Sequence, residues 1–162
     1  MSRANPQELI ETFRPLLEAA RNLDLTEPSR AELLLRERFD PHGPAAAALR
    51  ERLVELLAEG EIASRGEPPV RYGRVTRAVP ETQGQSIDVV DMTGPGPRHR
   101  HPNGEVDYCV ALEDQPTFDG REPGWVVYPP DSTHVPTVAG GRMLVVYLLP
   151  DGAIEFDPPA GS

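Results

Sequence analysis

The sequence contains no lysine. All sixteen basic residues are arginine, and with twenty-six acidic residues they give a net charge of −10. A chain this acidic is repelled by phosphate backbones, which argues against nucleic acid as its main partner. The first sixty residues have the length of a small helical DNA-binding head, but they carry eight arginines against eleven acidic residues and show no basic face. We therefore predict no nucleic-acid partner.

Cysteine and long apolar runs are also scarce. Cys109 is the only cysteine, which excludes an intrachain disulfide. No apolar run approaches the length that spans a membrane, and the N-terminus does not resemble a signal peptide. We therefore expect a cytoplasmic protein with no membrane partner. Cys109 has no base beside it in the sequence and is interpreted as a small buried side chain.

At 162 residues the chain suits one compact domain with an appendage. Residues 1–65 are predicted to be helical. Asn5 can cap a first helix that carries an apolar stripe, and Ser29–Glu32 repeats a capping pattern. A third helix is expected from Ala45 to Glu59, with Gly60 as its stop. This region is assigned to packing or dimerisation, and we expect a homodimer.

Residues 66–162 change character to short β segments separated by proline, glycine and aspartate. Val106, Tyr108, Val110 and Leu112 alternate with Asp107, Cys109 and Ala111, and a similar alternation returns from Met143 to Leu149. Regularly spaced short strands with this alternation predict an antiparallel barrel or jelly roll. The fold class expected is therefore mainly β with an α-helical N-terminal extension.

Three of the four histidines lie between residues 98 and 134. His99 and His101 are two apart, so on a strand both side chains point to the same face. Glu105 follows a Pro-Asn-Gly turn that can bring the next strand back beside them. His134 follows a second turn and can complete the set from a neighbouring strand. The fourth histidine, His42, lies in a Pro/Gly loop and is interpreted as a surface residue.

Three imidazoles and one carboxylate suit a divalent first-row transition metal. Manganese, iron, cobalt, nickel and zinc all accept these ligands, so the identity of the metal stays open. The alternative interpretation is that the three are solvated histidines around ordinary turns. The concentration of ligands in one stretch favours the metal.

This ligand pattern resembles that of the cupins. Their pattern is two histidines one residue apart, a glutamate four residues after the second, and then a glycine-rich segment with a proline, a turn and a third histidine. The resemblance spans about residues 70–156 and implies a cupin-type jelly-roll β-barrel. Two positions depart from it. Asp131 replaces an expected glycine, which requires a left-handed backbone there, and Val138 replaces an expected asparagine.

Nearly the whole chain is similar to the 4-hydroxylaminobenzoate lyase family, small cupin-like proteins of bacterial nitroaromatic breakdown. The similarity is carried by HRHPNGEVDYCVAL, GWVVYPPDSTHVPTV and GGRMLVVYLLPDGAIEF. It implies a hydroxylamino-substituted benzoate as substrate and protocatechuate (3,4-dihydroxybenzoate) as product, with release of ammonia.

The implied reaction resembles a Bamberger rearrangement and needs no nicotinamide or flavin, because it involves no net redox change. A metal held by the three histidines would act as Lewis acid, with Glu105 as fourth ligand or as a proton carrier. Glu105 and Asp107 are the candidates for proton transfer. Asp107 shares a strand face with Cys109 and Ala111, and the sequence does not show whether that face points inward or outward. A surface position near a turn is therefore an equal alternative for Asp107.

A benzoate would need an apolar pocket with one cationic anchor. The carboxylate calls for an arginine, which can bind it through two parallel hydrogen bonds. Arg71, Arg74, Arg98 and Arg100 are the nearest in sequence, and Arg71 or Arg74 is preferred because Arg100 lies between the two histidines and so faces away. Flat pocket walls are predicted from the aromatic side chains Tyr108, Trp125, Tyr128 and Tyr147.

Two other functions fit the same sequence. A cupin with these ligands can be an Fe(II) dioxygenase that acts on a small aromatic or thiol substrate and consumes oxygen. It can also be a non-catalytic sensor that binds a small molecule and signals through the helices, since a fold does not fix a function. Oxygen uptake identifies the first, and ligand binding without turnover identifies the second.

Overall fold

The computed structural model describes residues 5–156, so residues 1–4 and 157–162 of the two predicted regions lie outside it. The chain begins with helices α1 (Pro6–Ala19), α2 (Pro28–Arg38) and α3 (Pro44–Ala58). Asn5 caps α1 as predicted, its side chain accepting the Glu8 N–H at 2.9 Å. The expected cap of α2 is wrong, because that helix starts at Pro28 without a side-chain cap and Glu32 points to the sheet instead.

Nine strands follow within residues 5–156, and two of them contain the alternating segments from Val106 to Leu112 and from Met143 to Leu149. They are β1 (Arg65–Glu67), β2 (Val70–Thr76), β3 (Gln85–Met92), β4 (His99–His101), β5 (Glu105–Phe118), β6 (Gly124–Tyr128), β7 (Ser132–His134), β8 (Val138–Pro150) and β9 (Glu155–Phe156), with a short 3-10 helix η1 (Pro80–Thr82) before β3. No helix within residues 5–156 is both long and apolar enough to cross a membrane.

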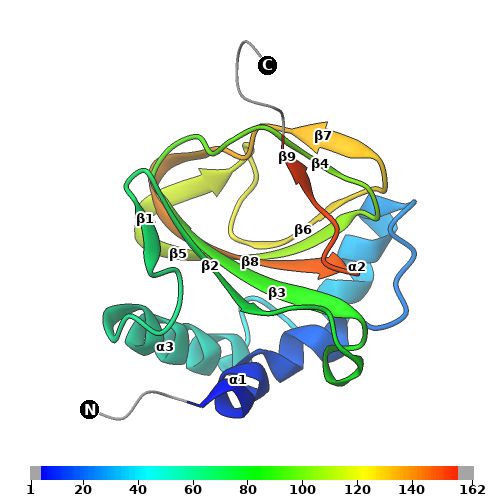
Figure 1. The fold of residues 1–162 in the computed structure, drawn as a ribbon, viewed down its shortest axis with the longest axis horizontal. Helices are drawn as coiled ribbons and strands as arrows, with labels where there is room; N and C mark the ends of the chain where they lie inside the picture. Colours follow the sequence, from blue (N-terminus) through cyan, green and yellow to red (C-terminus); the bar gives the residue numbers. More distant parts are fainter. Residues whose placement is uncertain (1–4, 157–162) are drawn as a thin grey trace.

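The strands form two sheets. The larger has the order β1-β2-β3-β8-β5-β6 and the smaller the order β7-β4-β9, with all pairings antiparallel. Figure 1 shows the three helices against one side of the large sheet and the small sheet on its other side. This confirms the mainly β jelly-roll fold with a helical N-terminal extension. The two sheets face each other as a sandwich and do not close into one hydrogen-bonded cylinder.

Alternation along the strands gives the large sheet two different faces. On β5 and β8, residues such as Tyr108 and Leu144 join the core shared with the helices. Their neighbours, such as Cys109 and Val145, join a second core between the sheets. Glu105 has the same parity as Cys109, so the inter-sheet face is the one that carries the predicted ligands.

Helix α2 covers one edge of the large sheet. The carboxylate of Glu32, which is 5% exposed, accepts the backbone N–H of Val127 on the edge strand β6 at 3.0 Å. The same carboxylate pairs with Arg121 and, at 3.5 Å, with Arg36. A free edge N–H is thereby satisfied by a side chain, which keeps β6 from pairing with another strand.

Candidate metal centre and cavity

The short strand pair β4–β7 brings the histidines together. His99 and His101 lie two apart on β4, and His99 pairs directly with His134 on β7. The turn after β4 then returns the chain to Glu105 at the start of β5. His99 is 3% exposed and His101 and Glu105 are fully buried, so these are not solvated loop residues. Asp131, in the turn before β7, has φ +66°, the left-handed backbone that the missing glycine required.

The four side chains converge on one point. Nε2 of His134 lies 3.0 Å from Nε2 of His99 and 3.0 Å from Nε2 of His101. The Glu105 carboxylate lies 3.2 Å from Nε2 of His101 and 3.6 Å from Nε2 of His134. All four ligand atoms fall within 4.8 Å of one another. Ligands about 2.0–2.2 Å from a shared ion lie about 3 Å apart, so the set fits a single divalent cation.

The protonation of the imidazoles also suits a metal. Burial, reinforced by the neighbouring His134, lowers the pKa of His99 to about 4. Burial, reinforced by His99 and His134, lowers the pKa of His101 to about 3. Both rings are therefore neutral near pH 7, which is the form that binds metal ions.

Glu105 and Asp107 bring two carboxyl groups into the same interior. Both are fully buried on the inter-sheet face of β5, so the surface interpretation of Asp107 is wrong. Burial raises the pKa of both groups, and the proximity of Glu105 raises that of Asp107 further. Apart from each other and the clustered imidazoles, the two carboxyl groups have no hydrogen-bonding partner within the described part of the chain. Buried carboxyls left in this state are typical of groups that serve a cation or a ligand.

Asp119 is part of the centre although the sequence analysis did not find it. Its Oδ2 lies 2.8 Å from Nδ1 of His134, and its Oδ1 accepts the backbone N–H of Thr137 at 2.8 Å. The hydroxyl of Tyr128 donates to the same Oδ2. Burial raises the pKa of Asp119, but the hydrogen bonds from His134, Tyr128 and Thr137 outweigh it and lower that pKa overall. An ionised Asp119 keeps the proton of His134 on Nδ1 and leaves Nε2 free for a metal.

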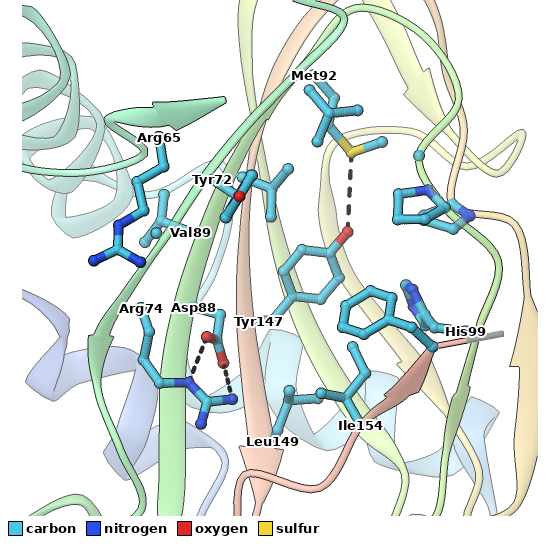
Figure 2. A pocket seen from close by; sticks show the side chains of 17 residues that line it. Arg65, Tyr72, Arg74, Asp88, Val89, Met92, His99, Tyr147, Leu149 and Ile154 are labelled. Carbon is cyan, nitrogen blue, oxygen red and sulfur yellow. Dashed lines mark hydrogen bonds and ion pairs between the residues drawn. The ribbon is translucent and has the colours of Figure 1, made fainter. Parts of the chain in front are cut away.

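A cavity of about 590 Å³ opens between the sheets and reaches His99. Its walls are largely apolar, and its volume is in the range of small-molecule sites. Figure 2 shows His99 on one side, Arg65 and Arg74 on the opposite side, and Tyr147 between them. Residues of the apolar wall include Val70, Val90, Met92, Leu149 and Ile154.

The four predicted aromatic walls divide between the two faces of the sheet. Tyr147 lines the cavity, and Tyr128 lies beside the metal centre, its ring centroid 4.3 Å from that of His134. Tyr108 and Trp125 belong instead to the core under the helices, where both pack edge-to-face on Phe39. These two residues do not reach the cavity, so the structure contradicts their placement in a substrate pocket.

Of the four arginines considered as anchors for the carboxylate, only Arg74 lines the cavity. Arg74 lines the cavity but is engaged by Asp88, with Nε 2.7 Å from Oδ1 and Nη2 3.2 Å from Oδ2. Arg71 is exposed and does not belong to the cavity wall. Arg98 does not line the cavity either, and Arg100 pairs with Asp131 and Glu155 outside it.

Comparison with known proteins identifies the family of this chain. The family described as PnbB, 4-hydroxylaminobenzoate lyase, matches residues 13–156. The chain belongs to the 4-hydroxylaminobenzoate lyase family. Within this family, a 4-hydroxylaminobenzoate lyase from Nocardioides sp. (strain LMS-CY) is 30% identical over 97% of this chain and 99% of its own length.

A second 4-hydroxylaminobenzoate lyase, from Pseudomonas putida, is 24% identical over 83% of this chain and 86% of its own length. Among solved structures, this lyase-family chain is similar to an RmlC-like cupin protein from Ralstonia eutropha JMP134, at 14% identity and a TM-score of 0.43. That match covers 57% of this chain and 62% of the other.

Proposed function

We propose that this lyase converts 4-hydroxylaminobenzoate and water into protocatechuate and ammonia. The observation that carries the proposal is a buried His-His-Glu-His cluster that borders an apolar cavity through His99, in a chain of this family. The reaction balances without a redox cofactor. The hydroxylamine oxygen leaves as one water, a second water adds to the ring carbon beside the C–N carbon, and a third hydrolyses the resulting imine, so one water is consumed in total.

His99, His101 and His134 would hold a divalent metal, with Glu105 as the fourth ligand. When bound, such an ion supplies Lewis-acid activation of an oxygen atom and lowers the pKa of a water. Asp119 fixes the orientation and tautomer of His134 by accepting its Nδ1–H. The inter-sheet walls exclude bulk water from the ring and so limit side reactions of the cationic species formed when the N–O bond breaks.

Asp107 is assigned the proton transfer. It lies two residues after Glu105 on the same face of β5 but is not one of the four clustered ligands. A hydroxyl group leaves poorly until it is protonated, so a buried carboxyl group beside the ligand set, whose pKa is raised by burial and by Glu105, suits that task. The same group can accept a proton from the water that adds to the ring.

The experiment is an anaerobic assay of purified protein with 4-hydroxylaminobenzoate and no added nicotinamide or flavin, with metal analysis on the same samples. We expect ammonia and protocatechuate in equal amounts. The variant His101→Ala should lose both the metal and the activity. The matched control His42→Ala changes the one histidine outside the cluster, which is exposed, and should keep both.

Two results would contradict the proposal. Full activity in metal-free protein would remove the metal from the mechanism. Turnover of an aromatic or thiol substrate only in the presence of oxygen, with oxygen uptake, would favour the dioxygenase that the same ligand set permits.

A further inference from the structure

The substrate of the proposed reaction is an anion, whereas the protein carries a net charge of −10. A benzoate is therefore repelled at long range and needs a local cation inside the cavity. Arg65 and Arg74 are the arginines in the cavity wall, within the residues described. We infer that Arg65 binds the substrate carboxylate and sets the preference for benzoates, an inference that rests on the proposed function for its choice of substrate.

Arg74 is not available for this role. Its guanidinium forms a two-point ion pair with Asp88, and its Nη2 also lies 3.5 Å from the carbonyl of Gly152. Asp88 is held in turn by the hydroxyl of Ser86 at 2.9 Å. The positive charge of Arg74 is thus neutralised where it stands, and a substrate carboxylate would have to compete with an existing carboxylate for the same donors.

Arg65 has the opposite character. Within residues 5–156 its side chain forms no hydrogen bond and no ion pair, so all of its guanidinium N–H donors are available to a ligand. It is exposed at the cavity mouth and so keeps its hydration until a ligand binds. A guanidinium in this state can bind a carboxylate through two parallel hydrogen bonds without first breaking an internal pair.

The edge strand β1 places Arg65 at the rim of the cavity, where it also borders a second, smaller cavity beside Leu9 of α1. On β1 it pairs directly with Tyr72 of β2, so both side chains point to the same face. Next to it, Gly66 has φ +78°, and a Cβ atom there would lie 3.0 Å from the Tyr72 ring. The absence of a side chain at Gly66 lets the Tyr72 ring lie across β1, where it forms part of the same cavity wall as Arg65.

The distance across the cavity suits the substrate. A space of 590 Å³ is about 10 Å across if roughly spherical, which is comparable to a para-substituted benzoate. Figure 2 shows His99 and Arg65 on opposite sides, with Tyr147 between them. A benzoate whose carboxylate lies at Arg65 therefore presents its para substituent toward the histidine cluster.

Binding is the most direct test. Titration calorimetry with 4-nitrobenzoate, a substrate-shaped anion without the reactive group, would compare wild type with Arg65→Met, which keeps the length of the side chain and removes the charge. We expect the dissociation constant to rise about 10- to 100-fold, the range for losing a charged hydrogen-bonding partner. The dissociation constant of Arg65→Lys should lie between those of wild type and Arg65→Met, because lysine keeps the charge and loses the two-point geometry. Arg77→Met, an exposed arginine outside the cavity wall, is the matched control and should bind as wild type.

Turnover gives a second and independent readout. Arg65→Met should lower kcat/KM for 4-hydroxylaminobenzoate by a similar factor and leave that for neutral phenylhydroxylamine unchanged. Unaltered 4-nitrobenzoate binding in Arg65→Met, an equal loss with both substrates, or loss of binding in Arg71→Met instead would each overturn the inference. If wild type binds 4-nitrobenzoate but does not turn over 4-hydroxylaminobenzoate, the proposed function fails while the binding comparison still decides the role of Arg65.

Discussion

Asp119 and His134 are 15 residues apart in sequence and meet through a 2.8 Å contact between Oδ2 and Nδ1. The contact joins the end of β5 to the end of β7 and fixes which nitrogen of the imidazole faces the cluster. Asp119 also accepts the N–H of Thr137, so its own position is held by the backbone. The carboxylate therefore acts on the metal centre through His134 and does not need to touch the ion.

Replacing Asp119 should weaken metal binding without removing a ligand. In Asp119→Asn, one of the two oxygens becomes an NH₂ group, which cannot accept a hydrogen bond, so the side chain can no longer accept from His134, Tyr128 and Thr137 together. We expect metal affinity to fall about 10- to 100-fold, as for other partners of metal-binding histidines. Competition with a chelator of known affinity measures the change. Asp131→Asn, an exposed residue that also has positive φ, is the matched control, and equal affinity in the two variants would contradict the role given to Asp119.

Three of the four ligands, His99, His101 and Glu105, could be predicted from sequence because their geometry is local. Two residues on one strand, a tight turn and a third residue at the start of the next strand are fixed by strand period and turn chemistry alone. Asp119 could not be found this way, because its contact with His134 depends on how β5 and β7 pack. Its only local signal is an aspartate before Gly120, which reads as an ordinary turn.

The positions of Tyr108 and Trp125 could have been predicted from the alternation of residues along β5. If Glu105 faces the space between the sheets, then Asp107 and Cys109 face it too, and Tyr108 must face the helices. Trp125 pairs directly with Tyr108, so it follows to the same side. Which arginine is free to bind a carboxylate was harder to predict. The ion pair between Arg74 and Asp88 depends on the register of β2 and β3, which residue composition does not reveal.

The contact of Glu32 with the sheet edge should matter for stability and not for chemistry. Glu32→Ala leaves the N–H of Val127 and the guanidinium of Arg121 without their buried partner. We expect a loss of about 1–3 kcal/mol in the free energy of unfolding, the usual cost of a buried polar group left unpaired. Urea denaturation measures it, with Glu37→Ala as control because Glu37 is exposed on the same helix. An equal effect of the two substitutions would show that the edge contact contributes nothing specific.

Asp107 should be needed for turnover but not for metal binding. Asp107→Asn keeps the shape of the side chain and removes its ability to transfer a proton. We expect kcat to fall about 100- to 10,000-fold, the range for loss of a general acid or base, at unchanged metal content. Asp114→Asn, an exposed position on the same strand, is the control and should keep wild-type kcat. Loss of the metal from Asp107→Asn would instead make Asp107 a ligand.

The hydroxyl of Tyr147 should contribute more to substrate binding than to the stability of the fold. Tyr147 is 5% exposed, and its hydroxyl lies in the cavity, 3.9 Å from the sulfur of Met92 (Figure 2). A thioether sulfur is a weak hydrogen-bond acceptor. A buried hydroxyl with so poor a partner contributes little stability, so Tyr147→Phe should leave the free energy of unfolding unchanged or raise it by up to about 1 kcal/mol. A substrate oxygen in the cavity is a better acceptor. We therefore expect kcat/KM for 4-hydroxylaminobenzoate to fall several-fold to about tenfold, the value of one hydrogen bond.

Tyr108→Phe is the matched control for that substitution, because Tyr108 is also buried but lies on the helix-covered face of the sheet. It should leave kcat/KM unchanged. Thermal unfolding and steady-state kinetics on the two variants separate the possibilities. A Tyr147→Phe protein that is destabilised but fully active would show that the hydroxyl serves packing, because a group retained for the substrate must affect catalysis more than folding.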